Sequence, residues 1–235
     1  MKEITNGKLK AYINEEGAYL ERLSFMDKKI FFDKSHLKDG GSMKVRGGMH
    51  VCAPNFSIDK LLNELPAHGF ARDLRWDILR EDEESLSLTL AGIKSYEDVY
   101  FTISYRLSDN KLNTRLKIEN KASEDKLIAP AFHPYFNTSF ENLTLDDYQI
   151  KREDLPGSIF ISSPDMTFKT EDFAIKIKGL SNVNTYTLWT DFLDDYVCLE
   201  PTFNGVSFSD ENLDPFSLGP GQSFIQEFDI IVDEL

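Results

Sequence analysis

A histidine among aromatic residues is the first feature of the sequence that can carry chemistry. The stretch from Ala131 to Asn137 reads AFHPYFN and follows a run that alternates like a β-strand. Histidine has an ordinary pKa near neutrality, so His133, held rigidly at the end of a strand, can give or take a proton at working pH. The alternative is a core histidine that donates to a backbone carbonyl, and this stretch alone does not decide between them.

A glutamate in apolar surroundings is the second candidate proton carrier. Glu200 ends an otherwise apolar strand within the segment CLEPT, residues 198–202. A carboxyl group in such a setting has a raised pKa and can accept a proton. The simpler interpretation is a strand-end carboxylate that faces water. The distance in sequence between His133 and Glu200 does not indicate whether the two are close in space.

Two arginines lie beside glycines that allow close backbone approach. Arg46 precedes Gly47 and Gly48, and a guanidinium there suits an anion or a hydroxyl group; the alternative is an ordinary turn. In the segment 65–73, His68 and Arg72 flank a glycine and a phenylalanine. Sugar sites combine an aromatic face with charged donors in this way, although a plain surface loop also fits.

Composition and charge exclude several classes of function. The chain has 235 residues with a formal net charge of −14, which argues against binding a nucleic-acid backbone. Its two cysteines make neither a disulfide framework nor a four-ligand zinc site. The N-terminus has no apolar leader and no run is long enough to span a membrane, so we expect a cytoplasmic protein with reduced thiols. No feature indicates an oligomeric state.

Period-two alternation predicts the elements that must position these residues. Apolar residues alternate with polar ones over 85–90, 101–107 and 112–118, and further strands are predicted at 158–161, 186–189, 196–200 and 224–231. Residues 18–25 and 30–32 flank a polar turn and predict a hairpin. Such alternation is typical of antiparallel sheets with one buried face. We therefore predict an all-β fold, a single antiparallel β-sandwich domain over residues 1–235.

Two segments show no strand pattern. Residues 36–48 contain four glycines and several lysines and are predicted to be a loop. Residues 58–65 allow a short helix, which Pro66 would end.

Taken together and in order, four motifs resemble the signature of the aldose 1-epimerases, or mutarotases, a superfamily that includes the hexose-6-phosphate epimerases. The motifs are RGG at 46–48, HGFAR at 68–72, HPYFN at 133–137 and CLEP at 198–201, and LGPGQ at 218–222 resembles the closing turn of the family. The resemblance covers nearly the whole chain.

The resemblance implies a large antiparallel β-sandwich, or supersandwich, that binds a sugar on one open face without metal or organic cofactor. It implies that Glu200 is the general base on the C1 hydroxyl and that His133 is the general acid on the ring oxygen. His68 matches a substrate-binding histidine. The expected activity is interconversion of the α and β anomers of an aldohexose by ring opening and reclosure.

The substrate remains open between two branches of the superfamily. Arg46 and Arg72 resemble the hexose-6-phosphate branch, whereas the segment 133–135 resembles the free-aldose branch, which we favour. Both arginines are equally compatible with hydroxyl binding, or with internal pairing of Arg46 to a carboxylate. A non-catalytic carbohydrate-binding domain is the alternative from another class, although binding alone needs no acid–base pair.

Overall fold

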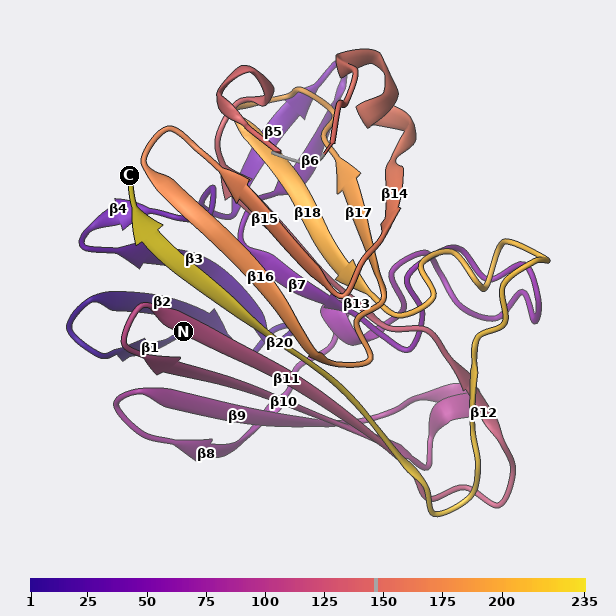
Figure 1. Ribbon diagram of the computed structural model, residues 1–235. Coiled ribbons are helices and arrows are strands. Elements are labelled where there is room, and N and C mark those ends of the chain that lie inside the picture. Colours follow the sequence, from indigo (N-terminus) through magenta and orange to yellow (C-terminus); the bar gives the residue numbers. More distant parts are fainter. Residues whose placement is uncertain (146–147) are drawn as a thin grey trace.

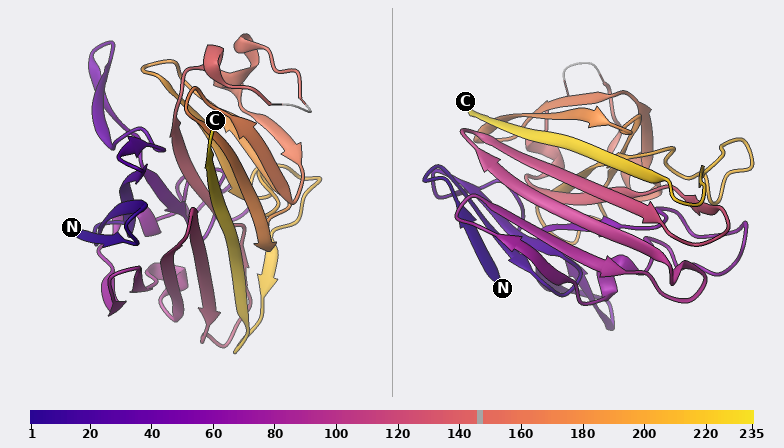
Figure 2. Two further views of the ribbon diagram at one scale, coloured as in Figure 1. Left: turned by 60° about the vertical axis from the view of Figure 1, so that its left-hand side comes forward. Right: turned by 90° about the horizontal axis from the view of Figure 1, so that it is seen from below.

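Two large antiparallel sheets stacked face to face form most of the molecule, as seen in a computed structural model that describes residues 1–145 and 148–235 (Figures 1 and 2). The first sheet has nine strands in the order β1-β2-β3-β7-β13-β18-β17-β14, with β4 paired to β3. Its strands are β1 (Lys2–Thr5), β2 (Leu9–Asn14), β3 (Tyr19–Phe25), β4 (Lys28–Lys29), β7 (Met49–Cys52), β13 (Ala131–Asn137), β14 (Ile159–Ser162), β17 (Thr185–Trp189) and β18 (Tyr196–Thr202).

The second sheet has seven strands in the order β15-β16-β20-β11-β10-β9-β8. They are β8 (Asp77–Glu81), β9 (Ser85–Ala91), β10 (Val99–Ser108), β11 (Lys111–Asn120), β15 (Asp165–Lys169), β16 (Phe173–Ser181) and β20 (Ser223–Glu234). Two small sheets pair β5 (Ser35–Asp39) with β6 (Ser42–Arg46) and β12 (Lys126–Ile128) with β19 (Phe216–Leu218). Short 3-10 helices are η1 (Ala71–Asp73), η2 (Lys94–Tyr96), η3 (Phe140–Asn142) and η4 (Arg152–Gly157). Nowhere in 1–145 or 148–235 is a helix long and apolar enough to cross a membrane.

The predicted all-β sandwich is confirmed, and its core comes from the alternation of each strand. In β9, β10 and β11 every second residue is buried, as the sequence pattern predicts. Phe132 of β13 packs edge-on against Phe228 of β20 with ring centroids 5.2 Å apart, and Phe136 packs on Phe168 of β15 at 4.8 Å. The even-numbered aromatics of β13 thus join the two sheets, and the odd-numbered His133 projects from the opposite face.

The segment predicted as a loop at 36–48 is a β-hairpin instead. Strands β5 and β6 pair from Ser35–Arg46 to Asp39–Ser42, and Gly40 and Gly41 form the two-residue turn between them. A Gly-Gly pair between two extended segments is itself a hairpin signal, and Met43 and Val45 alternate with polar residues in β6, so the sequence did contain evidence for this hairpin. The earlier predicted hairpin is present, although its returning strand is the short β4 at Lys28–Lys29 rather than residues 30–32.

The predicted helix at 58–65 is absent. The buried carboxylate of Asp59 accepts the backbone N–H groups of Leu61, Leu62, Glu64 and Leu65, so this side chain takes the place of the carbonyls that a helix would supply.

A close backbone approach fixes the loop that follows. Gly69 has φ +65°, and a Cβ there would lie 2.0 Å from the carbonyl oxygen of Ala53. That oxygen accepts the N–H groups of Phe70 and Ala71, each at 3.1 Å. Gly69 therefore lets the loop that carries His68 and Arg72 pack directly on the chain beyond β7.

We expect Gly69→Ala to lower the free energy of unfolding by more than about 1 kcal/mol, because the new Cβ meets backbone that cannot move aside and the φ is unfavourable. Urea denaturation followed by tryptophan fluorescence measures the change. Gly157→Ala is the matched control, since nothing lies within 4 Å of its Cβ position. Equal stability of the two variants would contradict the importance of this contact.

Candidate active site

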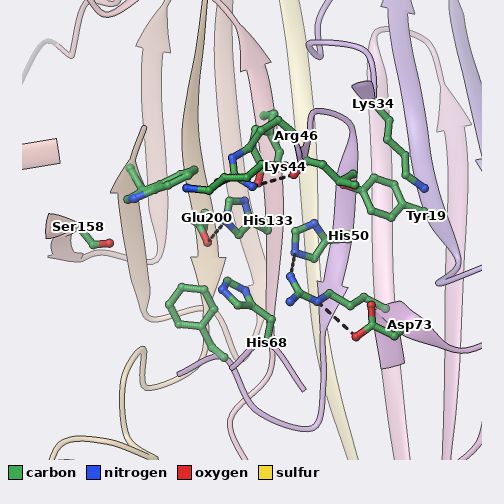
Figure 3. A pocket seen from close by; sticks show the side chains of 15 residues that line it. Tyr19, Lys34, Lys44, Arg46, His50, His68, Asp73, His133, Ser158 and Glu200 are labelled. Atoms are coloured by element: carbon green, nitrogen blue, oxygen red, sulfur yellow. Dashed lines mark hydrogen bonds and ion pairs between the residues drawn. The ribbon is translucent and has the colours of Figure 1, made fainter. Parts of the chain in front are cut away.

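One cavity of about 730 Å³ opens on the outer face of the nine-stranded sheet (Figure 3). All five residues that the sequence predicts for the site line it: Arg46, His68, Arg72, His133 and Glu200. They come from β6, the Gly69 loop, η1, β13 and β18, so the fold gathers segments far apart in the sequence.

Strand register brings His133 and Glu200 together. Ala131 pairs with Thr202 and Tyr135 with Cys198, so the residues between them, His133 and Glu200, lie opposite each other on neighbouring strands. Nε2 of His133 is 3.5 Å from Oε2 of Glu200. The prediction that both residues lie at the ends of their strands is wrong. Both lie inside their strands, because β13 runs to Asn137 and β18 to Thr202.

Burial controls the protonation of this pair. Only 5% of His133 and 1% of Glu200 is exposed. Burial raises the pKa of Glu200 well above its ordinary value. Burial first, and then His68, Arg72 and Arg46, lower the pKa of His133 well below 6.5. Both shifts disfavour charge, so the neutral forms of the pair are favoured.

A stack of rings fixes the direction of His133. Its imidazole packs on His50 (centroids 4.8 Å apart, 24° between planes) and on Tyr135 (4.7 Å, 14°), and the rings of His50 and Tyr135 are themselves 6.4 Å apart, so the three rings form a triangle. Trp189 packs edge-on at 5.8 Å. Of the aromatic neighbours in sequence, only Tyr135 packs on His133, because the neighbouring phenylalanines point into the core. The stacking holds Nε2 toward Glu200.

His68 is held beside a cysteine as a neutral imidazole. Its Nδ1 lies 3.1 Å from Sγ of Cys52. Burial, and then Arg72 and Arg46, lower the pKa of His68 to about 4. His68 is therefore uncharged at neutral pH and offers its remaining nitrogen to the cavity.

The two arginines have different partners. Nε and Nη2 of Arg46 lie 2.9 and 2.8 Å from Oδ2 of Asp191, and the guanidinium lies 5.3 Å from the ring centre of Trp189. Internal pairing of Arg46, one of the alternatives that the sequence left open, is thus present. Nη1 of Arg72 donates to Nε2 of His50 at 3.2 Å, and its Nε lies 3.8 Å from Asp73.

Several cavity residues escaped sequence analysis. His50 is the clearest, because three of the four histidines in the chain meet here, and His50 and Cys52 alternate with the core residues Met49 and Val51. That alternation was a usable signal. The approach of Asp191 to Arg46 has no signal in sequence, since it joins a turn after β17 to a distant hairpin. Further cavity residues are Tyr19, Lys34, Lys44, Phe56, Asp73 and Tyr135.

Four residues that line the cavity carry buried polar atoms without hydrogen-bond partners in residues 1–145 and 148–235. Among the described residues, no protein group bonds Nδ1 of His50, Nε of Arg72, Nδ1 of His133 or Oε2 of Glu200, and all four atoms are buried. Buried polar atoms normally have partners, so a ligand with several hydroxyl groups would satisfy what the fold leaves open. Two groups also have the composition of a metal site, His50 with Cys52 and His68, and His133 with Cys198 and Glu200.

Comparisons with known proteins concern the sequence and the fold. The sequence profile described as aldose 1-epimerase matches residues 2–167. A Salmonella typhimurium protein named "Putative glucose-6-phosphate 1-epimerase" is 32% identical over 100 residues, which are 40% of this chain and 33% of that protein.

Solved structures share the fold. The Slr1438 protein of Synechocystis superposes with a TM-score of 0.80 at 20% identity, covering 99% of this chain and 95% of that one. A "galactose mutarotase related enzyme" of Lactobacillus acidophilus gives 0.79 at 17% identity, covering 99% and 97%.

We expect Glu200→Gln to stabilise the fold increasingly as pH rises. The pKa of Glu200 is higher in the folded state than in the unfolded state. The stability that protonated Glu200 contributes is therefore fully present below the unfolded-state pKa and is lost as pH rises through the folded-state pKa. Glutamine carries no such penalty. In thermal denaturation from pH 4.5 upward, the melting temperature of the variant should exceed that of the unmodified chain by an increasing margin. Each kcal/mol of difference in the free energy of unfolding raises it by about 2–4 °C.

The exposed Glu84→Gln is the matched control and should show no widening difference from the unmodified chain. A constant difference for Glu200→Gln across the same pH range would show that Glu200 is not buried at a cost.

Proposed function

This chain belongs to the aldose 1-epimerase family, and from that premise we propose that it interconverts the α and β anomers of an aldohexose. The observation that carries the proposal is the buried pair of His133 and Glu200, 3.5 Å apart on a cavity whose unpartnered polar atoms suit a sugar. Family membership rests on the profile match over residues 2–167.

The reaction moves one proton off the sugar and another onto it. Glu200 removes the proton of the C1 hydroxyl while His133 delivers a proton to the ring oxygen, and the C1–O bond to the ring breaks. Rotation about C1–C2 exposes the other face of the aldehyde. The ring oxygen then attacks C1, His133 takes back its proton, and Glu200 returns a proton to the C1 oxygen. The pair ends as it began.

The pair of His133 and Glu200 holds a single mobile proton between its two members at every stage of this cycle. A protonated Glu200 beside a neutral His133, and an ionised Glu200 beside a protonated His133, contain the same number of protons and differ by one transfer between them. The neutral arrangement is the one that burial favours. The charged arrangement is the one that acts on the sugar, whose hydroxyl groups supply the hydrogen bonds that Oε2 of Glu200 and Nδ1 of His133 lack.

His68 and Arg72 complete the proposed binding surface. Neutral His68 accepts from or donates to a ring or C1 oxygen, and Arg72 donates to hydroxyl groups through Nε, which makes an ion pair with Asp73 at 3.8 Å but no hydrogen bond with any residue that the structure describes. Trp189 presents an aromatic surface at the same cavity.

Replacing either proton carrier should abolish most activity. We expect His133→Ala and Glu200→Gln each to slow anomerisation by about 10²- to 10⁴-fold, the usual contribution of a positioned acid or base. Polarimetry of freshly dissolved α-D-glucose and α-D-galactose, corrected for the buffer rate, measures this, and circular dichroism checks the fold.

The exposed His36→Ala is the control for loss of a histidine and should keep full activity. Full activity in either site variant would refute the role given to that residue. If the unmodified chain changes the optical rotation of several aldoses and their 6-phosphates no faster than buffer does, a carbohydrate-binding domain would be the better explanation.

A second candidate substrate is a hexose 6-phosphate. Four cations, Lys34, Lys44, Arg46 and Arg72, line the cavity of a chain whose net charge is −14. A phosphate group would find charge-assisted hydrogen bonds among them. The name of the Salmonella relative points the same way, for the segment that the two share.

Arg46→Ala separates the two substrates. If Arg46 binds phosphate, kcat/KM should fall at least about tenfold for glucose 6-phosphate and much less for glucose, because a charge-assisted hydrogen bond contributes about 1.5–3 kcal/mol. Coupled oxidation of the β anomer by an anomer-specific dehydrogenase measures both. Equal losses for the two sugars would exclude a phosphate site at Arg46, and the exposed Arg80→Ala controls for loss of net charge.

A further inference from the structure

A thiol and two imidazoles meet at one end of the cavity. His50 and Cys52 are alternate residues of β7 and so project from the same face of the sheet. His68 reaches them from the Gly69 loop, where its own backbone has φ +67° and its N–H donates to Phe56. Their ligand atoms all lie within 4.8 Å of one another. Strand register and the packed loop hold all three before any ligand arrives.

The chemistry of this group is that of a soft or borderline cation. Imidazole nitrogen and thiolate sulfur are the ligands of Zn²⁺, whereas Mg²⁺ and Ca²⁺ require oxygen ligands, which this group does not contain. The closest contact, 3.1 Å between Sγ of Cys52 and Nδ1 of His68, needs only a small opening to admit an ion bonded to both atoms. Cys52 is a free, buried cysteine, and the mechanism proposed above does not use it.

Three ligands leave the fourth tetrahedral position open. The cavity lies on that side, because His50 and His68 line it and both rings pack on His133, at centroid distances of 4.8 and 5.4 Å. An ion there would take water or a sugar oxygen as its fourth ligand and would occupy the space beside the proton donor.

Arg72 opposes the ion through His50. Its guanidinium donates to Nε2 of His50 at 3.2 Å. If the ion binds Nε2, Arg72 loses that acceptor. If the ion binds Nδ1, the imidazole proton moves to Nε2 and meets a donor. Both cases end the contact between Arg72 and His50, and Arg72 has room to move because its side chain is 32% exposed.

We propose that His50, Cys52 and His68 bind one thiophilic divalent cation such as Zn²⁺, which displaces Arg72 and inhibits sugar turnover. As the sulfur–metal bond forms, the thiol proton of Cys52 passes to solvent and no oxidation occurs. Binding of the ion is independent of the proposed function, whereas inhibition rests on it.

The test uses the full chain without an affinity tag, stripped with a chelator and kept reduced. Titration with Co²⁺ should give one equivalent with tetrahedral visible absorption and a thiolate-to-cobalt charge-transfer band, and Zn²⁺ should remove both signals. Cys52→Ser should lose the charge-transfer band and weaken Zn²⁺ binding at least about tenfold, because even the loss of an outer-shell partner of a ligand costs about 10- to 100-fold. His36→Ala should retain both. The absence of a charge-transfer band in the unmodified chain would overturn the proposal.

Two further variants locate the ion. Cys198→Ser should keep the charge-transfer band; if this variant loses it and Cys52→Ser keeps it, the ion binds with His133 and Glu200 instead, and the proposal fails. Arg72→Gln should tighten Zn²⁺ binding by roughly tenfold, because a nearby positive charge and a competing donor are removed. Unchanged or weaker binding in Arg72→Gln would refute the displacement of Arg72.

Anomerisation assays separate this proposal from the proposed function. Zn²⁺ should inhibit the unmodified chain and His36→Ala, and Cys52→Ser should resist it. Stoichiometric binding to a chain that anomerises no sugar would establish the metal site and refute the proposed function. If Zn²⁺ binds stoichiometrically and a measurable rate of anomerisation does not change, the proposed inhibition is refuted.

Discussion

The pairing of β13 with β7 on one side and β18 on the other is the constraint on which the site depends. His133 pairs with His50 across one ladder, lies opposite Glu200 across the other, and Glu200 pairs in turn with Thr187 of β17. Four neighbouring strands thus contribute one row of polar residues to a single face. A slip of one residue in β13 would turn Phe132 into the cavity and His133 into the core, so the same alternation that builds the sandwich also selects the functional face.

The hydrophobic core offsets the free-energy cost of the unpartnered polar atoms on this face. Val197 and Leu199 of β18 are buried between the sheets, on either side of Cys198 in sequence, and β7 and β13 contribute to the same core. The burial of these apolar side chains stabilises the same strands that hold the unpartnered polar atoms. Part of the energetic penalty lies on the outer face of the nine-stranded sheet, at His50, His133 and Glu200, and Thr114 and Gln226 of the seven-stranded sheet also carry buried atoms without partners among the described residues.

How far the sequence leads depends on whether a feature is local. Alternation is local, so β9, β10 and β11 and the all-β class could be predicted, and His133 and Glu200 could be selected as candidates from their apolar neighbours. Strand register is not local: nothing between residues 133 and 200 shows that these two face each other. The same holds for Asp191, which pairs with the distant Arg46, and for Asp59, whose carboxylate replaces helical hydrogen bonds that only the folded loop can offer it.

In both proposals, Arg72 controls which charge the cavity accepts. Its guanidinium, together with Arg46, lowers the pKa values of His68 and His133 and so keeps these imidazoles neutral, while burial contributes the larger part. Neutral imidazoles can bind sugar hydroxyls, and they are also the form that coordinates a metal. With Arg72 against His50, the positive potential favours hydroxyl or anionic ligands and repels cations. With Arg72 withdrawn toward solvent, the same nitrogens and the Cys52 sulfur become a cation site. In the two proposals, the position of the Arg72 side chain therefore couples two mutually exclusive uses of a single set of histidines.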